Sequence, residues 1–333
     1  MIDSNKSRYG RHYDCSLPYE IRLETEMYRT GKTLTEVLEE LDPSNKYHGT
    51  ALEGLDAFSR QLKRFDIKVS GSQSDIVDKF FKNNQTAILF PEFVRRCVEA
   101  GMSENPIVED IVAVTTNIDG MDYRSISAQE EKYNIDYIPA FQVKTNTNLC
   151  EIHKRGRCLT ASYEALRFQR ISVFSVMLKQ IGQYICKQQL SDALSLIQSL
   201  HINETPLDNY GLVGAQDIHS IALQLHDNGG FDLNVLLCPM KIMPKLKEYF
   251  GDLLKYENGQ IYLNHIRVIP SFDSLADQIV GLDRNYAIEM VECGGVNVDY
   301  EKLIDRQFEK SAIYCCTGFS LINPKAIAIK YYR

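Results

Sequence analysis

Residues 171–200, ISVFSVMLKQIGQYICKQQLSDALSLIQSL, carry the strongest regular pattern in the chain. Apolar side chains recur every three or four residues, which is the spacing of one face of an α-helix. This pattern predicts one helix of about 30 residues, roughly 45 Å long at about 1.5 Å per residue. The turn-prone NETPLDNYG at residues 203–211 predicts that the helix ends before it. The apolar face consists of Phe174, Leu178, Ile181, Ile185, Leu190, Ala193, Leu194 and Ile197.

The N-terminal part of the chain predicts short helices joined by polar turns. YEIRLETEMYRTG (residues 19–31), TLTEVLEELDPS (33–44) and ALEGLDAFSRQLKRFDI (51–67) each place apolar residues three or four apart. Thr33 or Thr35 is the expected N-cap of the second helix, because a threonine oxygen accepts from the free amides of the first turn. Each segment is amphipathic, so its apolar stripe must pack against another part of the protein.

The next segment, SDIVDKFFKNNQTAILFPEFVRRCVEAGM at residues 74–102, predicts two helices. The first begins at Ser74, and an apolar run then ends at Pro91. Proline has no backbone N–H, so we expect it to separate this run from a second helix that ends near Gly101.

Strand patterns follow in IVEDIVAVTTNI (107–118), YIPAFQVKT (137–145) and LCEIHKRGRCLTAS (149–162). The stretch at 125–157 is too polar for a core sheet and too long for a tight connection. We therefore expect a protruding two-stranded loop, and long loops of this kind are usually functional or disordered.

The C-terminal part alternates helix and strand patterns from residue 214 to residue 293, which predicts a compact α/β domain. The tail SAIYCCTGFSLINPKAIAIKYYR (311–333) predicts two strands separated at Asn323 and Pro324.

Composition is that of a globular protein. Of 333 residues, 44% are hydrophobic and 24% are charged, which fits one large domain or two interleaved domains. The net charge of −7 and the lack of a long single-sign run argue against a dedicated nucleic-acid binder. No stretch has the roughly 20 apolar residues that a membrane span needs, and the first 15 residues lack the apolar core of a signal peptide. A soluble protein made in a cytoplasm is expected.

Nine scattered cysteines are expected to be reduced thiols, mostly in the core. Cys150, His153 and Cys158 have the chemistry of zinc ligands, but their spacing matches no standard zinc site. The neighbours Cys315 and Cys316 are expected to point to opposite faces of a strand, one buried and one partly exposed.

Enzymatic motifs are missing from the sequence. It contains no G-x-S-x-G, no G-x-x-x-x-G-K-[ST] and no H-E-x-x-H. We assign no catalytic, metal-binding or cofactor-binding residue, and the chain is expected not to be an enzyme.

The order of these parts resembles the major capsid proteins of tailed bacteriophages, which have the Hong Kong 97 phage-type fold. RCLTASYEALRFQRISVFSVMLKQIGQYI (157–185) is similar to the family's passage from an extended hairpin into the spine helix. The segments at 51–67, 88–102 and 114–126 look similar to the N-terminal halves of prophage capsid proteins of gut bacteria. The resemblance spans residues 50 to 333, including an N-P-K-A-I signature at 323–327.

This resemblance implies an α+β fold with four parts. They are an N-terminal helical arm with lead-in strands (1–119), an extended β-hairpin loop (120–160), a peripheral domain with the spine helix (161–210 plus 295–333) and an α/β axial domain (211–294).

The resemblance also implies a function, that of a structural protein of the virion. Copies of the chain would self-assemble into pentamers and hexamers of an icosahedral phage head enclosing double-stranded DNA. The expected partners are other copies, the portal protein, scaffold or protease proteins, and the packaged DNA through non-specific contact, with no membrane and no cofactor. Assembly would take place in the cytoplasm of a bacterial host.

The stretch at 151–170 has five basic residues against two acidic ones, which suits docking onto an acidic neighbour surface such as one bearing Glu53 or Asp56. A solvated basic turn is the alternative. A covalent lysine–asparagine crosslink, from Lys144 or Lys154 to Asn323, is a third use of these residues. The candidate assembly residues are Arg124, Lys144, Lys154, Arg155, Arg157, Arg167 and Arg170.

Two other functions stay open. An encapsulin-type bacterial compartment shell has the same fold and encloses an enzyme in place of a genome. An α/β enzyme with a small-molecule site in residues 211–294 is the second alternative, although no convergent set of titratable groups marks such a site.

Overall fold

The computed structural model describes residues 19–104, 106–120, 122–130, 141–145, 149–199, 204–206, 215–271, 278–303 and 308–331. The chain forms two compact units, each made of three separate stretches. Unit 1 takes Met1–Cys97, Cys158–Leu178 and Val298–Ser311, and unit 2 takes Val98–Arg157, Lys179–Asn297 and Ala312–Arg333. The four-part division expected from the sequence stays a prediction.

The long helix is confirmed as α5, Ile171–Ser199. Of the eight residues predicted on its apolar face, all but Ile181 are buried. Unit 1 holds the start of α5, most of α3 (Asn84–Ser103) and the helices η1 (Thr25–Thr30), α1 (Leu34–Leu41), η2 (Ser44–Tyr47), α2 (Ala57–Arg64), η3 (Val77–Phe81) and α4 (Tyr163–Arg167), together with strand segments described below.

The predicted cap of α1 is confirmed at Thr33. Its side chain accepts from the Glu36 amide at 3.2 Å, and the Glu36 carboxylate accepts from the Thr33 amide at 2.7 Å. This reciprocal pair is a capping box, which satisfies two amides that the helix itself leaves free.

The helix predictions over residues 19–31 and 51–67 need correction. The helix expected over 19–31 is reduced to the short 3₁₀ helix η1. The helix expected over 51–67 begins only at Ala57, because Gly54 has a left-handed backbone (φ 80°) and Asp56 caps the helix through the Ser59 amide.

Pro91 does not end a helix, because it lies inside α3, which runs unbroken for 20 residues. The segment from Ser74 is an isolated bridge and η3 in place of the expected α-helix. Burial explains why α3 tolerates proline: Leu89, Phe90 and Phe93 are at most 5% exposed, so packing offsets the missing hydrogen bond.

An aromatic cluster forms the core of unit 1. Phe90 of α3 stacks on Phe174 of α5 with ring centroids 6.0 Å apart, and it meets Tyr300 edge-on at 5.7 Å. Phe80 lies 5.6 Å from Phe90 and 5.3 Å from Phe93. Such rings bury large areas and prefer these offset or edge-on geometries.

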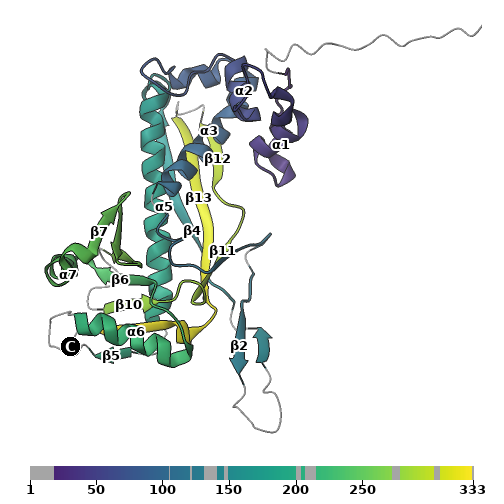
Figure 1. The fold of residues 1–333 in the computed structure, drawn as a ribbon. Helices are drawn as coiled ribbons and strands as arrows, with labels where there is room; N and C mark the ends of the chain where they lie inside the picture. Colours follow the sequence, from purple (N-terminus) through teal and green to yellow (C-terminus); the bar gives the residue numbers. More distant parts are fainter. Residues whose placement is uncertain are drawn as a thin grey trace, which may run out of the picture. The chain divides into compact units, whose positions relative to one another are not determined.

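Unit 2 contains a seven-stranded mixed sheet in the order β5-β14-β10-β6-β9-β8-β7. Helix α6 (Ala215–Gly229) packs against β10 and β14, and α7 (Met243–Phe250) packs against β7 (Figure 1). The alternation expected from the sequence is thus confirmed as an α/β arrangement. The strands are β5 (Glu204–Pro206), β6 (Val235–Pro239), β7 (Leu254–Glu257), β8 (Gln260–Leu263), β9 (Ile266–Ser271), β10 (Gln278–Leu282) and β14 (Ile327–Tyr331).

Both faces of this sheet are buried. Along β6, Val235 and Leu237 join one hydrophobic cluster while Leu236 and Cys238 join another. The alternation follows from the two-residue period of a strand, and it places one core on each side of the sheet.

A five-stranded sheet has the order β1-β11-β13-β12, with β4 also paired to β13. A third sheet holds only β2 and β3. The bounds are β1 (Val114–Asn117), β2 (Ile126–Glu130), β3 (Phe141–Thr145), β4 (Ile152–Ser162), β11 (Ile288–Glu292), β12 (Asn297–Leu303) and β13 (Phe308–Leu321).

The tail forms two strands, β13 and β14, separated at Asn323 and Pro324 as predicted. Within β13 the cysteine prediction is wrong in part, since Cys315 and Cys316 are both buried, at 0% and 8% exposure. Neighbouring strand residues point to opposite faces, so both faces of β13 are covered at this point.

Candidate assembly surface

The hairpin formed by β2 and β3 has no other strand partner in the described part of the chain. Its strands are antiparallel, with Ile126 opposite Thr145 and Glu130 opposite Phe141. The Ile126 side chain is 57% exposed. A two-stranded hairpin is marginally stable by itself in water.

A buried carboxylate fixes the segment that leads into the hairpin. Glu289 of β11 accepts from four hydroxyl groups, those of Thr116 (2.5 Å), Tyr123 (2.7 Å), Ser125 (2.7 Å) and Ser320 (3.0 Å). Burial alone would raise the pKa of Glu289, but these hydrogen bonds outweigh it and place the pKa below the usual value. Tyr123 and Ser125 lie just before β2, so Glu289 holds the start of the hairpin on unit 2.

Sequence reasoning missed Glu289. A glutamate in a short strand gives no signal of its own, and the four donors to Glu289 lie up to 173 residues away along the chain. Only the meeting of β1, β11 and β13 brings them together.

Three candidate assembly residues lie on β4, and each has a partner inside unit 2. The Lys154 ammonium lies 3.3 Å from the centre of the Tyr314 ring, and the Arg157 guanidinium lies 3.7 Å from that of Tyr184. Arg155 makes two bonds to Asp192, of 2.8 and 2.5 Å. Arg155 is half-buried and therefore contributes to the fold of the subunit itself.

Two more candidates belong to unit 1. Arg167 at the end of α4 lies 3.4 Å from an Asp78 oxygen and stacks over the Phe81 ring. Arg170 is exposed and donates to the backbone carbonyls of Ser72 and Ser74.

The last two candidates lie beside or in the hairpin of unit 2. Arg124 is exposed just before β2, and Lys144 is paired with Ser127 in the hairpin backbone. The seven residues thus divide between the two units.

An exposed apolar stripe accompanies Arg170 in unit 1. Val173, Val176 and Met177 occupy one face of α5 and are 51%, 55% and 48% exposed, and Phe168 just before the helix is 70% exposed. Their spacing of three and four residues gives them a common side of the helix, away from the buried stripe. Apolar groups gathered on a surface mark an interaction site more often than isolated ones do.

The acidic residues suggested as docking partners have partners of their own. Asp56 caps α2 and binds Arg96, and Glu53 binds His48 and the Gly49 amide. In the described residues no three His, Cys, Asp or Glu side chains gather as a metal site would need, Cys150, His153 and Cys158 included. The cysteines of the described residues form no disulfide bond with one another.

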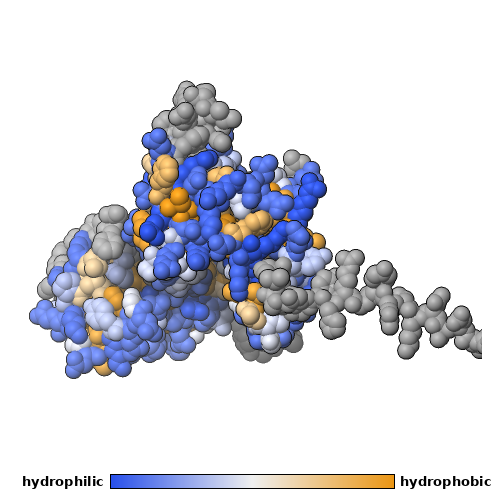
Figure 2. Space-filling view, turned by 90° about the horizontal axis from the view of Figure 1, so that it is seen from above, coloured by the Kyte–Doolittle hydropathy of each residue, from blue (hydrophilic) through white to orange (hydrophobic). Residues whose placement is uncertain are grey.

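One face of the molecule is seen in Figure 2. Figure 2 shows hydrophilic residues over most of the face that it presents, with hydrophobic residues in small patches. Among the described helices, none combines the length and the apolar character that a membrane span requires.

By sequence, no protein-family model and no curated protein matches the chain. By structure, the chain is similar to a virus-like particle protein from Pyrococcus furiosus, with a TM-score of 0.50 and 16% identity over 72% of this chain and 99% of that one. It is also similar to the encapsulin of a complex from Synechococcus elongatus, with a TM-score of 0.51 and 10% identity over 68% of this chain and 86% of that one.

The capsid of the cyanophage P-SCSP1u is a third similar structure, with a TM-score of 0.50 and 13% identity over 68% of this chain and 88% of that one. All three are shell-forming proteins. The chain therefore has the Hong Kong 97 phage-type capsid fold, an α+β fold that phage heads and encapsulins share.

Proposed function

We propose that this chain is the major capsid protein of a tailed bacteriophage and builds the icosahedral head from pentamers and hexamers. The observation that carries the proposal is the β2–β3 hairpin, which has no strand partner in the described part of its own chain. The capsid fold supports it, since similar chains form closed shells. A head-to-tail contact repeated around a ring closes into such oligomers.

The surface that receives the hairpin is, in this proposal, the α5 stripe of Phe168, Val173, Val176 and Met177 on a second copy. In the sequence, the stretch at 129–139, QEEKYNIDYIP, includes the apolar residues Tyr133, Ile135, Tyr137 and Ile138. Three acidic residues against one lysine give this segment a charge of −2. That charge complements the exposed Arg170 beside the stripe, which favours docking in one orientation.

The seven basic residues named from the sequence remain proposed interface residues. Arg124, Lys154, Arg157 and Arg170 are exposed, as an interface residue must be. Arg155 is the least suitable, because its ion pair with Asp192 lies within the subunit.

The remaining partners follow from the same proposal. The head would contain a portal, would use scaffold or protease proteins, and would be assembled in a bacterial cytoplasm. A net charge of −7 suits weak, non-specific contact with packaged DNA, because tight binding would hinder its entry and release. A shell role requires no catalysis and no cofactor.

An encapsulin-type compartment is the second candidate, favoured by the likeness to the Synechococcus encapsulin. The helices before Leu52 favour the phage head, since an N-terminal arm can brace a capsid or act during its assembly.

Electron microscopy and size-exclusion chromatography of the expressed full chain test the shell function. We expect megadalton particles, whereas a monomer or dimer at high concentration contradicts a shell. Particles purified from the native host then separate the candidates: nuclease-protected DNA indicates a phage head, and a co-purified enzyme indicates a compartment.

A further inference from the structure

Two cysteines of unit 2 lie opposite each other at the end of the β11–β13 ladder. The antiparallel register of these strands runs to Glu292 opposite Thr317. One step further it places Cys293 opposite Cys316, and the Cys293 amide donates to the Cys316 carbonyl at 2.9 Å. The backbone pairing therefore extends as far as the two cysteines.

Side chains that are directly opposite on such a ladder lie on one face, about 4.5–5.5 Å apart at their Cβ atoms. Glu289 and Ser320 are an opposite pair on the same ladder, and the Ser320 hydroxyl donates to the Glu289 carboxylate at 3.0 Å. Cys293 and Cys316 follow four residues along each strand, which the two-residue period of a strand places on the same face. Their side chains are therefore expected to meet as those of Glu289 and Ser320 do.

The backbone spacing of the pair suits a disulfide bond. Opposite residues that share a backbone hydrogen bond are about 5.5 Å apart at Cα in an antiparallel ladder, and disulfide-bonded cysteines have Cα atoms about 4.4–6.8 Å apart. Gly294 and Gly295 follow Cys293 directly, with φ 74° and 68°, and nothing lies within 4 Å of the Cβ position of Gly294. The end of β11 thus has room for the small movement that brings the Cβ atoms to disulfide distance.

The two thiols differ in their access to solvent. Cys293 is half-buried, whereas Cys316 is 8% exposed, so a dissolved oxidant reaches Cys293 first. Burial and the neighbouring Cys293 raise the pKa of Cys316, and the positive charge of Lys154 on β4 opposes this rise. A nearby cation favours the thiolate, which is the form that attacks a disulfide.

Four other described cysteines are kept as neutral thiols by burial. It raises the pKa of Cys150 and Cys186 to about 11 and that of Cys238 to about 12. Burial raises the pKa of Cys315 as well. Thiols of this kind are poor nucleophiles at neutral pH, so they do not compete with the opposite pair.

We propose that Cys293 and Cys316 are a modification site, a dithiol that glutathione disulfide or a similar small disulfide oxidises to a disulfide bond. The Cys293 thiolate attacks one sulfur of glutathione disulfide, which forms a mixed disulfide and releases one glutathione thiolate. The Cys316 thiolate then attacks the Cys293 sulfur and releases the second glutathione thiolate. The two cysteines lose two electrons and two protons, and the two glutathione molecules take them up.

The bond closes the loop between residues 293 and 316, which restricts the unfolded chain and stabilises the subunit. Thiols stay reduced in a cytoplasm, so the bond forms when the protein enters an oxidising medium. This modification goes beyond the proposed function and operates in a shell subunit of either kind.

Treatment of the folded full-length chain with glutathione disulfide, followed by alkylation and peptide mass spectrometry, tests the proposal. We expect one pair of peptides joined through Cys293 and Cys316, lighter than the two reduced peptides by two hydrogen atoms. The urea midpoint should rise on oxidation and return after reduction with dithiothreitol. Full alkylation of both cysteines after the treatment overturns the proposal, and so does a bond from either one to a different cysteine.

Serine variants test the order of the two steps. Cys316→Ser should stop at the mixed disulfide and retain one glutathione on Cys293, whereas Cys293→Ser should abolish both the bond and the rise in the urea midpoint. Cys158→Ser is the matched control, because it removes an exposed thiol outside the pair and should leave both changes intact. A rise in midpoint that persists in Cys293→Ser overturns the stabilising role of the bond.

Discussion

Gly101 of α3 and Gly182 of α5 lie against each other's helix backbone in unit 2. A Cβ atom at Gly182 would stand 2.2 Å from the Val98 carbonyl oxygen, and one at Gly101 would stand 2.2 Å from that of Lys179. Two helices that approach so closely leave no room for even a methyl group, so glycine is required at both positions.

Gly182→Ala should destabilise the subunit by about 1–3 kcal/mol, because the added methyl forces α3 and α5 apart. This loss exceeds the gain of about 1 kcal/mol in helix propensity that alanine brings. Urea denaturation of the unassembled subunit measures the difference. Gly120→Ala is the control, since nothing lies within 4 Å of its Cβ position; a wild-type midpoint for Gly182→Ala would contradict the close crossing.

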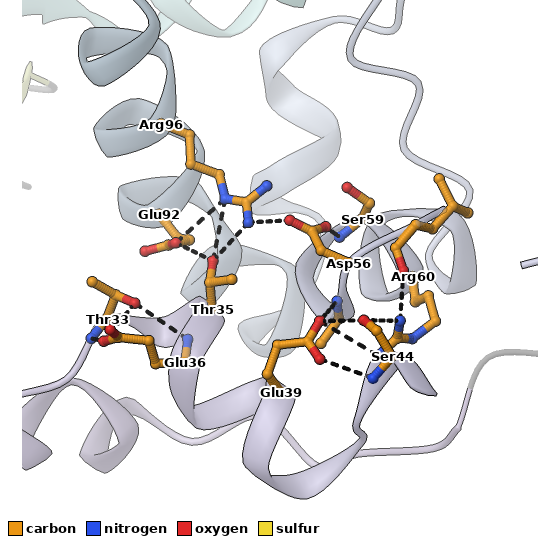
Figure 3. Close-up of polar contacts among 12 residues, drawn as sticks. Thr33, Thr35, Glu36, Glu39, Ser44, Asp56, Ser59, Arg60, Glu92 and Arg96 are labelled. Carbon is orange, nitrogen blue, oxygen red and sulfur yellow. Dashed lines mark hydrogen bonds and ion pairs between the residues drawn. The ribbon is translucent and has the colours of Figure 1, made fainter. Parts of the chain in front are cut away.

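Arg60 of α2 donates to the Ser44 hydroxyl at 2.9 Å (Figure 3) and to the Asp42 carboxylate at 3.0 Å. Arg60→Met should cost about 3–5 kcal/mol, because it leaves Asp42, only 1% exposed, as a buried charge without its cation. Replacing both residues, as in Arg60→Met with Asp42→Leu, should recover part of the loss, since no unpaired charge then remains. Lys63→Ala on the exposed face of α2 should change stability by no more than about 0.5 kcal/mol. Equal losses in the single and double variants, measured by urea denaturation, would show that the ion pair is not the cause.

Glu289→Gln should destabilise unit 2 by about 1–3 kcal/mol at neutral pH, because an amide offers fewer acceptor sites to four hydroxyl donors. The pKa of Glu289 is below its usual value, so its contribution is complete above the unfolded-state pKa of about 4.3 and is lost as pH falls through the folded-state pKa. Urea denaturation at several pH values should show the two proteins converging in acid. A difference that stays constant between neutral pH and pH 3 would contradict this assignment.

Val176→Asp should block particle formation and leave the subunit folded. The residue is 55% exposed on α5, so a charge there is tolerated in the free subunit but is desolvated when a second copy covers the stripe. Particle yield by sedimentation measures assembly, and circular dichroism checks the fold. Ser195→Asp puts the same charge on an exposed site farther along α5 and should assemble normally; full assembly of the Val176 variant would exclude the stripe as an interface.

Local sequence patterns predicted the structure correctly where the conformation of an element depends mainly on its own residues. The period of residues 171–200 predicted α5, Thr33 was one of the two caps expected for α1, and Asn323 with Pro324 marked the break before β14. They failed at Pro91, where the burial of its neighbours in α3 outweighs the missing hydrogen bond. They also failed at residues 51–56, where a turn and the Asp56 cap delay the start of α2.

The candidate surface divides in the same way. Basic charge in residues 151–170 is visible in the sequence, but the partners of Lys154, Arg155 and Arg157 are not, since they come from β13 and α5. The exposed stripe on α5 could not be identified from the sequence for a related reason. Val173, Val176 and Met177 look like core residues until the structure shows which face of the helix is covered.

By itself the sequence determined α5, a cap of α1, the break before β14 and the order of parts that resembles a capsid protein, because periodicity, caps and turn residues act within a few positions of the chain. Only the tertiary structure decided which groups meet: Glu289 with its four hydroxyls, Arg96 with α1 and α2, and the two glycines where α3 crosses α5. These contacts join residues far apart in sequence. Patterns that extend over a few positions cannot predict them, because the distance between such residues depends on how the whole chain packs.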